Sequence, residues 1–241
     1  MLASTWLRAP TDSKGTILFP ELDSNHLLVI GAGPGLGGSI AKRFAREGFS
    51  VTLAARTATK LEPVVAELKD LGAEVDTLLL DAGDTENFVA ELQRFAEQRA
   101  PGVVVYNAAV FVPNRILATP LSEQAAAYNV DVLGSIAAAQ VLTPAMREAG
   151  RGTFFITGGG FGHHPSAEYA TLSIGKAGVL ATSSILHDEL APAGVQATSV
   201  TVHGAIAPGT AFDPDTIAET YWQLHTQPAK EWTAETLFSG E

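Results

Sequence analysis

Short apolar runs alternate with amphipathic helical segments along most of this chain. The first run, residues 27–30, has the length and bulk of a fully buried parallel strand and ends at Gly31. Apolar residues at helical spacing follow over residues 36–47, and Gly48 ends that segment. A second apolar run opens at Phe49. The pattern predicts a strand, a glycine turn, a helix and a second strand, which together form a βαβ unit.

The same alternation continues to the C-terminus. Strands alternating with helices of this length are typical of a doubly wound parallel sheet, so we predict a three-layer α/β/α Rossmann fold. It forms a single domain over residues 26–241, preceded by an N-terminal extension, residues 1–25, with little periodicity. We expect Ser122 to cap a long helix that Gly150 ends. The predicted strands are 26–30, 49–53, 74–80, 102–106, 153–156, 195–202 and 233–238, and the predicted helices are 36–47, 59–71, 85–99, 122–149, 167–190 and 215–226.

The turn between the first strand and the first helix is crowded with glycines. A diphosphate lies against a backbone only where no side chain intrudes, and the free N–H groups and dipole of a helix N-terminus favour an anion. A glycine turn between a buried strand and an amphipathic helix therefore predicts a dinucleotide site. The alternative is a turn whose glycines serve only close packing. The expected contact residues are Gly31, Gly33, Pro34, Gly35, Leu36 and Gly37.

The residues after the second strand bear on which dinucleotide binds. In such folds an acid there holds the ribose 2′-hydroxyl of NAD, but this chain has Arg56 and Thr57 and no acid. Because a guanidinium matches a phosphate bidentately, Arg56 favours the 2′-phosphate of NADP over NAD. The alternative is an exposed arginine at a helix start, with NAD bound without its usual acid. Asp81 and Ala82, after the third strand, either meet the adenine edge or simply begin the next helix.

Composition narrows the classes of function. The chain has 241 residues, 46% of them hydrophobic, and a formal net charge of −11. That charge argues against nucleic acid or an anionic membrane surface as a partner. The absence of cysteine excludes disulfides, thiolate metal sites and a cysteine nucleophile, and we predict no metal site. No run approaches the length of a membrane span and the N-terminus lacks a signal-peptide pattern, so we expect a cytoplasmic protein.

Several motifs resemble those of the short-chain dehydrogenase/reductase family. They are the spacing Gly31-x-x-x-Gly35-x-Gly37, the pair Asp81-Ala82, the run Tyr106-Asn107-Ala108-Ala109, and Lys176 on the long helix after the fifth strand. The resemblance covers nearly the whole chain from residue 26 to the helix at Trp222, and it implies an oxidoreductase that binds a nicotinamide dinucleotide. It further implies cofactor contacts for Asn107, Ala108, Ala109 and Lys176, with Ile206 as the backbone partner of the nicotinamide amide.

The catalytic residues of that family are only partly matched. The resemblance implies an Asn, a Ser that orients the carbonyl, and a Tyr that transfers the proton four residues before a Lys. Lys176 is present, but Leu172 stands at the Tyr position and Gly159 at the Ser position. Asp131 falls at the Asn position and is a candidate ion-pair partner of Lys176. The chain therefore resembles a divergent member that lacks the usual catalytic Tyr and Ser.

Other side chains are candidates for the missing proton donor. Tyr169 is two helical turns before Lys176 on roughly the same face, a rise of about 10 Å. His163 and His164 fall in a loop at the carboxyl edge of the sheet, where ligands bind, and histidine titrates near neutrality. Thr157 is a candidate hydrogen-bond partner of a substrate oxygen. Each also has a structural interpretation, as a packed or an exposed loop residue.

Two hypotheses of function follow. The first is an NADP-dependent oxidoreductase that transfers hydride to or from a small organic carbonyl or alcohol substrate with a non-standard proton donor. The second, motivated by Leu172 and Gly159, is a dinucleotide-binding protein without redox activity that acts as a regulatory or scaffold subunit. The alanine-rich helices 122–149 and 167–190 are apolar on more than one face, which predicts a homodimer or homotetramer through this pair.

Overall fold

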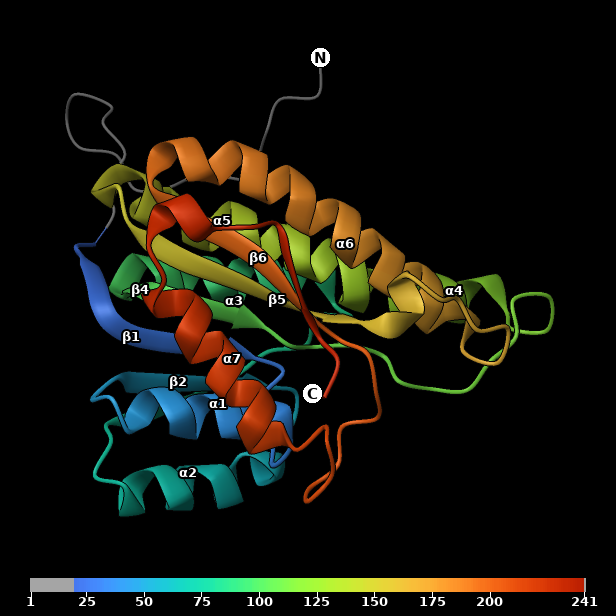
Figure 1. Cartoon of the computed structure of the whole chain (residues 1–241), viewed down its shortest axis with the longest axis horizontal. Helices are drawn as coiled ribbons and strands as arrows, with labels where there is room; N and C mark the ends of the chain where they lie inside the picture. The colour runs from blue at the N-terminus through green and yellow to red at the C-terminus, as the bar shows by residue number, and fades with distance from the viewer. Residues whose placement is uncertain (1–19, 241) are drawn as a thin grey trace.

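The structure is a computed structural model that describes residues 20–240. A single parallel sheet runs through this part of the chain. Its strands are β1 (Leu22–Ile30), β2 (Ser50–Ala55), β3 (Val75–Leu79), β4 (Ala100–Tyr106), β5 (Gly152–Gly159), β6 (Val195–Val202) and β7 (Glu235–Phe238). Their order is β3-β2-β1-β4-β5-β6-β7, and every neighbouring pair runs parallel (Figure 1). This confirms the predicted doubly wound fold. Most of the predicted N-terminal extension, residues 1–19, lies outside the described residues, as does residue 241.

Helices cover both faces of the sheet. They are α1 (Leu36–Ala45), α2 (Glu62–Asp70), α3 (Thr85–Gln98), α4 (Leu121–Tyr128), α5 (Gly134–Ala149), α6 (Ala170–Leu190) and α7 (Pro214–Thr226), with single 3₁₀ turns η1 (Ala58–Lys60), η3 (Gly160–Gly162), η4 (Ala191–Ala193) and η5 (Ala229–Glu231) and the π-helical turn η2 (Asn129–Leu133). One core lies beneath α1, α2 and α7, and the other beneath α3, α5 and α6 (Figure 1).

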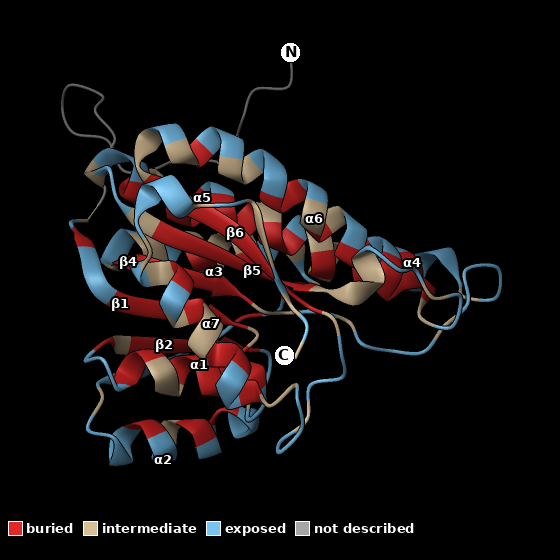
Figure 2. Ribbon diagram, in the orientation of Figure 1, coloured by how far each residue is buried: buried red, intermediate tan, exposed pale blue. Residues whose placement is uncertain are grey.

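The central strands are buried on both faces, as parallel strands between two helical layers must be, whereas the edge strands β3 and β7 are partly exposed. In β1 the side chains alternate, so that Leu27 and Val29 join the core under α1 while Leu28 and Ile30 join the core under α5. Figure 2 shows the central strands buried along most of their length, with the exposed positions on the outer faces of the helices and in the loops. The continuous apolar runs of the sequence therefore mark buried strands.

The helix predicted over residues 122–149 is interrupted by the π-helical turn Asn129–Leu133. The buried hydroxyl of Tyr106 donates a hydrogen bond to the carbonyl oxygen of Val130 at this point. A side chain inserted at the helical ladder draws that carbonyl aside and makes room for a wider turn. The combined stretch Leu121–Ala149 has the length and composition of a membrane-spanning helix, whereas no such segment was predicted from the sequence. Half of its most apolar window is buried inside this fold.

Several element boundaries differ from the prediction. Strand β1 begins at Leu22, four residues before the predicted start. Ser122 does not cap α4, because Pro120 is the N-cap residue and no side chain accepts a hydrogen bond there. Gly150 does end α5, in the left-handed conformation with φ 65°, as predicted.

Two loops project side by side beyond the carboxyl ends of the strands, at the end of the molecule where α4 lies (Figure 1). Residues 107–120 follow β4, and residues 160–169 follow β5. A β-bridge pairs Asn114 with Tyr169, and the Asn114 amide donates to the carbonyl oxygen of Glu168 at 2.8 Å. Ligands of doubly wound sheets bind at the carboxyl ends of the strands, so these loops border the candidate site.

Candidate active site

The glycine turn has the open surface that a diphosphate needs. Gly31 has φ +86°, and a Cβ there would lie 2.4 Å from the Ala108 amide nitrogen. A Cβ on Gly37 would lie 3.0 Å from the Gly31 carbonyl oxygen, so these two glycines allow close packing. A Cβ on Gly33 or Gly35 would meet nothing within 4 Å, and no side chain caps the first turn of α1. The turn therefore fits a bound anion on its open side and a packed backbone on the other.

The residues expected to select the dinucleotide lie beyond β2 and β3. Arg56 and Thr57 directly follow β2 and are exposed. No carboxylate among residues 20–240 forms an ion pair with the Arg56 guanidinium. Ala82 is buried, and Asp81 accepts a hydrogen bond from the Gly83 amide at 2.9 Å through Oδ1. Asp81 thus shapes the turn before α3 through Oδ1.

A buried hydrogen-bond chain joins the glycine turn to α7. The Asn107 side chain donates to the Gly31 carbonyl oxygen at 2.9 Å, and the Thr157 hydroxyl donates to Asn107 Oδ1 at 2.9 Å. The hydroxyls of Thr157 and Tyr221 are 2.8 Å apart. Because the Thr157 hydrogen is committed to Asn107, the Tyr221 hydroxyl is the donor of that pair. Thr157, which we expected to meet a substrate oxygen, instead already uses its hydrogen within the protein.

Lys176 is buried at the centre of the site, and its Nζ donates to the Thr157 carbonyl oxygen at 2.7 Å. Burial lowers the pKa of Lys176, and the Asp131 carboxylate opposes this effect. Burial raises the pKa of Asp131 to about 6. Two effects act in the opposite direction, namely the Val110 amide, which donates to Asp131 Oδ1 at 2.8 Å, and the charge of Lys176. The predicted ion pair between Asp131 and Lys176 does not form, because no described acid lies within 4 Å of the Lys176 ammonium. The two charges interact over a longer range.

A pocket of about 750 Å³ opens between the ends of β4, β5, β6 and helix α6. It brings together five residues that were predicted from the sequence to form the site: Asn107, Ala109, Thr157, Lys176 and Ile206. Its walls are mostly apolar. Because Asn107 both lines this pocket and bonds to Gly31, the pocket is continuous with the predicted dinucleotide site.

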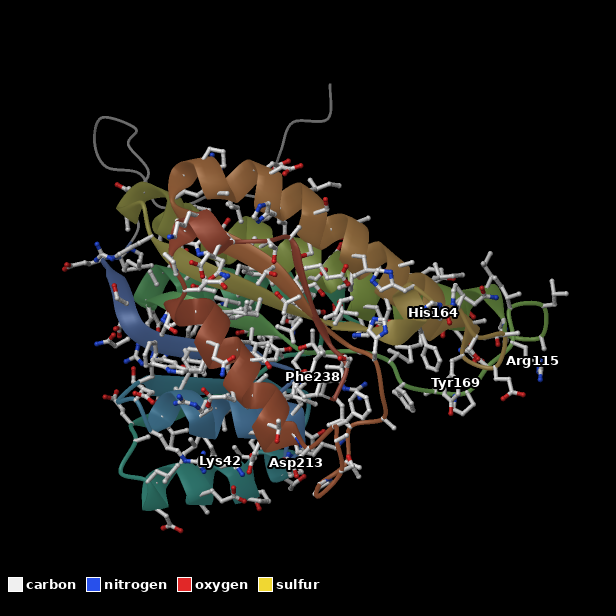
Figure 3. The ribbon with its side chains drawn as sticks, viewed as in Figure 1. Lys42, Arg115, His164, Tyr169, Asp213 and Phe238 are labelled. Carbon is white, nitrogen blue, oxygen red and sulfur yellow. The ribbon has the colours of Figure 1, made fainter. Side chains whose placement is uncertain are left out.

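The predicted two-turn relation of Tyr169 to Lys176 along one helix is wrong. Tyr169 is the N-cap residue of α6, with non-helical backbone angles φ −131° and ψ 52°, and lies before the helix. Its ring stacks on Phe161 at a centroid distance of 5.3 Å and lies 5.2 Å from Phe111. Both phenylalanines line the pocket and Tyr169 does not. Figure 3 shows Tyr169 among the projecting loops, farther from the sheet than His164.

Three histidines gather at the mouth of the pocket. The Nε2 atom of His163 is 2.8 Å from a carboxylate oxygen of Glu235 on β7. His164 and His203 line the pocket, with ring centroids 6.0 Å apart, and the His203 ring is 5.5 Å from that of His163. His203 was missed in the sequence, although its place directly after β6, next to Gly204, marks it as a residue of the carboxyl edge. Tyr221 was missed because it reads as an ordinary core residue of α7.

The match of the chain to known proteins agrees with this geometry. A family model for short chain dehydrogenases matches residues 25–213. The chain belongs to the short-chain dehydrogenase/reductase family. A very-long-chain 3-oxoacyl-CoA reductase from Aspergillus niger is 30% identical over 170 residues, which are 68% of this chain and 49% of that protein. The chain thus spans about half the length of the curated relatives it matches.

Solved structures of the same family share the fold. A short-chain dehydrogenase from Rhodopseudomonas palustris is 27% identical, with a TM-score of 0.80 over 90% of this chain and 98% of that one. A metagenomic short-chain oxidoreductase, solved in complex with NADP, is 25% identical, with a TM-score of 0.78 over 90% of this chain and 97% of that one. The recognition of the family from the sequence is therefore confirmed.

This family member carries no hydroxyl at two positions of the pocket wall. Leu172 is buried one helical turn before Lys176 and lines the pocket. Gly159 also lines it, and a Cβ there would lie 3.3 Å from Lys176 Cε. Neither residue transfers a proton or orients a carbonyl oxygen. The wall that includes α6 therefore offers the ammonium of Lys176 and no tyrosine.

Proposed function

We propose that this chain is an NADP-dependent oxidoreductase that transfers hydride to or from a small organic carbonyl or alcohol substrate. The observation that carries the proposal is the position of Asn107, which bonds to the glycine turn and also lines the pocket that contains Lys176. A dinucleotide on the open side of the turn would extend its nicotinamide end along this route. When bound, that nicotinamide supplies the hydride.

The residues proposed to hold the dinucleotide come from the carboxyl ends of five strands and from helix α6, which carries Lys176. The turn at Gly33 and Gly35 meets the diphosphate with its backbone, and Lys176 has ammonium hydrogens left for the nicotinamide ribose beyond the one donated to Thr157. Asp131 supports the charge of Lys176. The further proposed contacts are Gly31, Pro34, Leu36, Gly37, Thr57, Asp81, Ala82, Ala108, Ala109 and Ile206.

Selection of NADP over NAD rests on Arg56, whose exposed guanidinium has no carboxylate partner among the described residues. A hydrogen bond to a charged group contributes about 1.5–3 kcal/mol, and the exposure of Arg56 argues for the lower end. We therefore expect Arg56→Ala to raise the Kd of NADPH roughly tenfold and to leave that of NADH unchanged. Lys60→Ala removes an exposed cation from the next turn and serves as the matched control. Equal weakening of both dinucleotides contradicts the assignment.

The activity is tested by turnover on a panel of carbonyl compounds and activated alkenes with NADPH. A 3-oxoacyl thioester belongs in the panel, because the similar Aspergillus niger protein carries that name and the pocket walls are mostly apolar. We expect turnover in the wild type and its loss in Lys176→Ala. Tight NADPH binding without turnover on any substrate, in the wild type, contradicts the proposal and supports the scaffold alternative.

We also propose a homodimer or homotetramer built through α4, α5 and α6. Apolar side chains on these helices are exposed, Leu121 at 79% and Ile185 at 57%. Exposed apolar surface of this kind marks interaction sites on soluble proteins. Light scattering of the eluting protein measures the mass, and a monomer at micromolar concentration contradicts this proposal.

A further inference from the structure

We infer that His164 and His203 act together as the general acid of the reaction, in place of the tyrosine that this chain lacks. The inference rests on the oxidoreductase function proposed above. It assigns the proton to two loops, after β5 and after β6, instead of to helix α6.

The residues that line the pocket leave few proton donors. Among the described residues that line it, the side chains able to act as a general acid are those of Lys176, His164 and His203. Tyr169 lies outside the lining, with its ring between Phe111 and Phe161. Lys176 is held at the Thr157 carbonyl oxygen behind Gly159. The two imidazoles are therefore the donors available to a substrate oxygen.

The histidine pair is held in place by its surroundings. The backbone amide of His203 donates to the Phe238 carbonyl oxygen at 3.0 Å, which fixes the residue against the end of β7. Its Nε2 atom is buried and has no hydrogen-bond partner among the described residues. A Cβ on Gly160 would lie 3.3 Å from the Cα of His203, so the glycine lets the two loops approach. A buried imidazole nitrogen without a partner is costly in a resting protein, and a proton shared with a ligand or with His164 removes that cost.

Within residues 20–240, the charged and titratable groups placed near the pair are His163, Glu235 and Lys176. Glu235 on β7 bonds to His163, so the third imidazole is paired with a carboxylate and does not line the pocket. Lys176 of α6 faces the pocket from the other side of Gly159.

The proposed step is one proton transfer. As the carbonyl carbon gains the hydride, the electron pair of the C=O π bond forms a new O–H bond. An imidazolium N–H bond breaks and supplies that proton. The imidazole left neutral recovers its proton from water at the mouth of the pocket. In the oxidation direction the neutral imidazole accepts the alcohol proton.

The variants His164→Asn, His203→Asn and the double variant test this assignment, with His163→Asn as the matched control. General acid catalysis contributes about 10²–10⁴-fold, so we expect the double variant to lose at least about 100-fold in kcat and each single variant about tenfold. The Kd of NADPH stays within about twofold, because the pair donates to the substrate oxygen. We expect the pH profile of kcat to differ between the wild type and the double variant, because the variant lacks the imidazole acid. His163→Asn keeps kcat within about threefold of wild type.

Two results overturn the inference while the proposed function survives. In one, the double variant keeps its kcat and pH profile; in the other, Tyr169→Phe, which keeps the ring stack, causes the loss instead. A further variant, which combines Gly159→Ser with Leu172→Tyr, separates the remaining outcomes. If it reduces substrate while the wild type does not, the pocket is competent and the histidines are not donors. If both proteins bind NADPH and neither turns over, the oxidoreductase function itself fails, and the histidine assignment fails with it.

Discussion

We expect the His26→Leu variant to lose a pH dependence of folding stability that the wild-type chain shows between pH 6.5 and 4. His26 is fully buried on β1, with Nε2 2.9 Å from Thr52 Oγ1 and Nδ1 2.7 Å from Ser50 Oγ. The Nη1 atom of Arg99 lies 3.2 Å from Nδ1. A guanidinium only donates hydrogen bonds, so Nδ1 is the acceptor and the proton sits on Nε2. A second proton on Nδ1 would place two hydrogen-bond donors, the imidazolium and the Arg99 guanidinium, face to face.

The magnitude follows from the pKa of His26, which burial lowers from 6.5 to about 4. The Arg99 charge contributes to this lowering, while Asp23 and Asp76 act in the opposite direction. Between these two values the unfolded chain binds a proton that the folded chain does not, so acid favours unfolding. The contribution is therefore complete above pH 6.5 and is lost as the pH falls through about 4. The loss amounts to about 3 kcal/mol.

The assay is urea unfolding of both proteins at half-unit steps from pH 7.5 to 4. Leucine cannot replace the hydrogen bonds to Ser50 and Thr52, so the variant is less stable than the wild type at pH 7.5. The informative quantity is the difference between the two stability curves, which we expect to shrink by about 3 kcal/mol toward pH 4. His225, whose pKa burial also lowers, is present in both proteins and cancels in the difference. Parallel curves would refute the reasoning.

Three further substitutions test the glycine turn and the buried hydrogen-bond chain beneath it. Gly31→Ala should cost more than about 2 kcal/mol of unfolding free energy, because its φ is +86° and its Cβ would lie 2.4 Å from the Ala108 nitrogen. Gly33→Ala has an open Cβ position, so it should keep the wild-type stability in urea. It should bind NADPH at least about tenfold more weakly, because the methyl group would stand where the diphosphate binds. A stable Gly31→Ala protein would contradict the packing role. Tyr221→Phe should lower the unfolding free energy by about 1 kcal/mol, since it leaves the Thr157 hydroxyl without its donor; an unchanged urea midpoint would show that this hydrogen bond contributes nothing.

The sequence predicted the order of elements well because the relevant signals are local. Apolar runs mark buried strands, and Gly150 ends α5 through its own φ. The interruption of the long helix could not be read locally, because it depends on Tyr106, 24 residues before the Val130 carbonyl that it draws aside. Capping failed at Ser122 because the preceding Pro120 already fixes the turn. Errors thus arise where a distant side chain, or a stiff neighbour, overrides a local preference.

The same distinction applies to the candidate site. Gly31, Asn107 and Lys176 were found from motifs, and the structure brings them to one edge of the sheet. Tyr221 and His203 were not found, because their partners are far away in the sequence: Thr157 for the first and the end of β7 for the second. Which of several loop side chains lines a pocket is decided by how the loops fold over the strand ends. That information is absent from residue spacing along one helix.

Burial of Lys176 separates the two functional hypotheses on energetic grounds. Moving an ammonium into a protein interior costs several kcal/mol unless it is paired, and no described carboxylate lies within 4 Å of it. One carbonyl oxygen, that of Thr157, accepts one of its three hydrogens. A methionine would fill the same space in a scaffold without that cost. The ammonium hydrogens that Thr157 does not accept are available to a ligand that carries hydroxyl groups. A buried lysine therefore favours the enzyme over the scaffold, although Leu172 stands in place of the tyrosine one turn before Lys176.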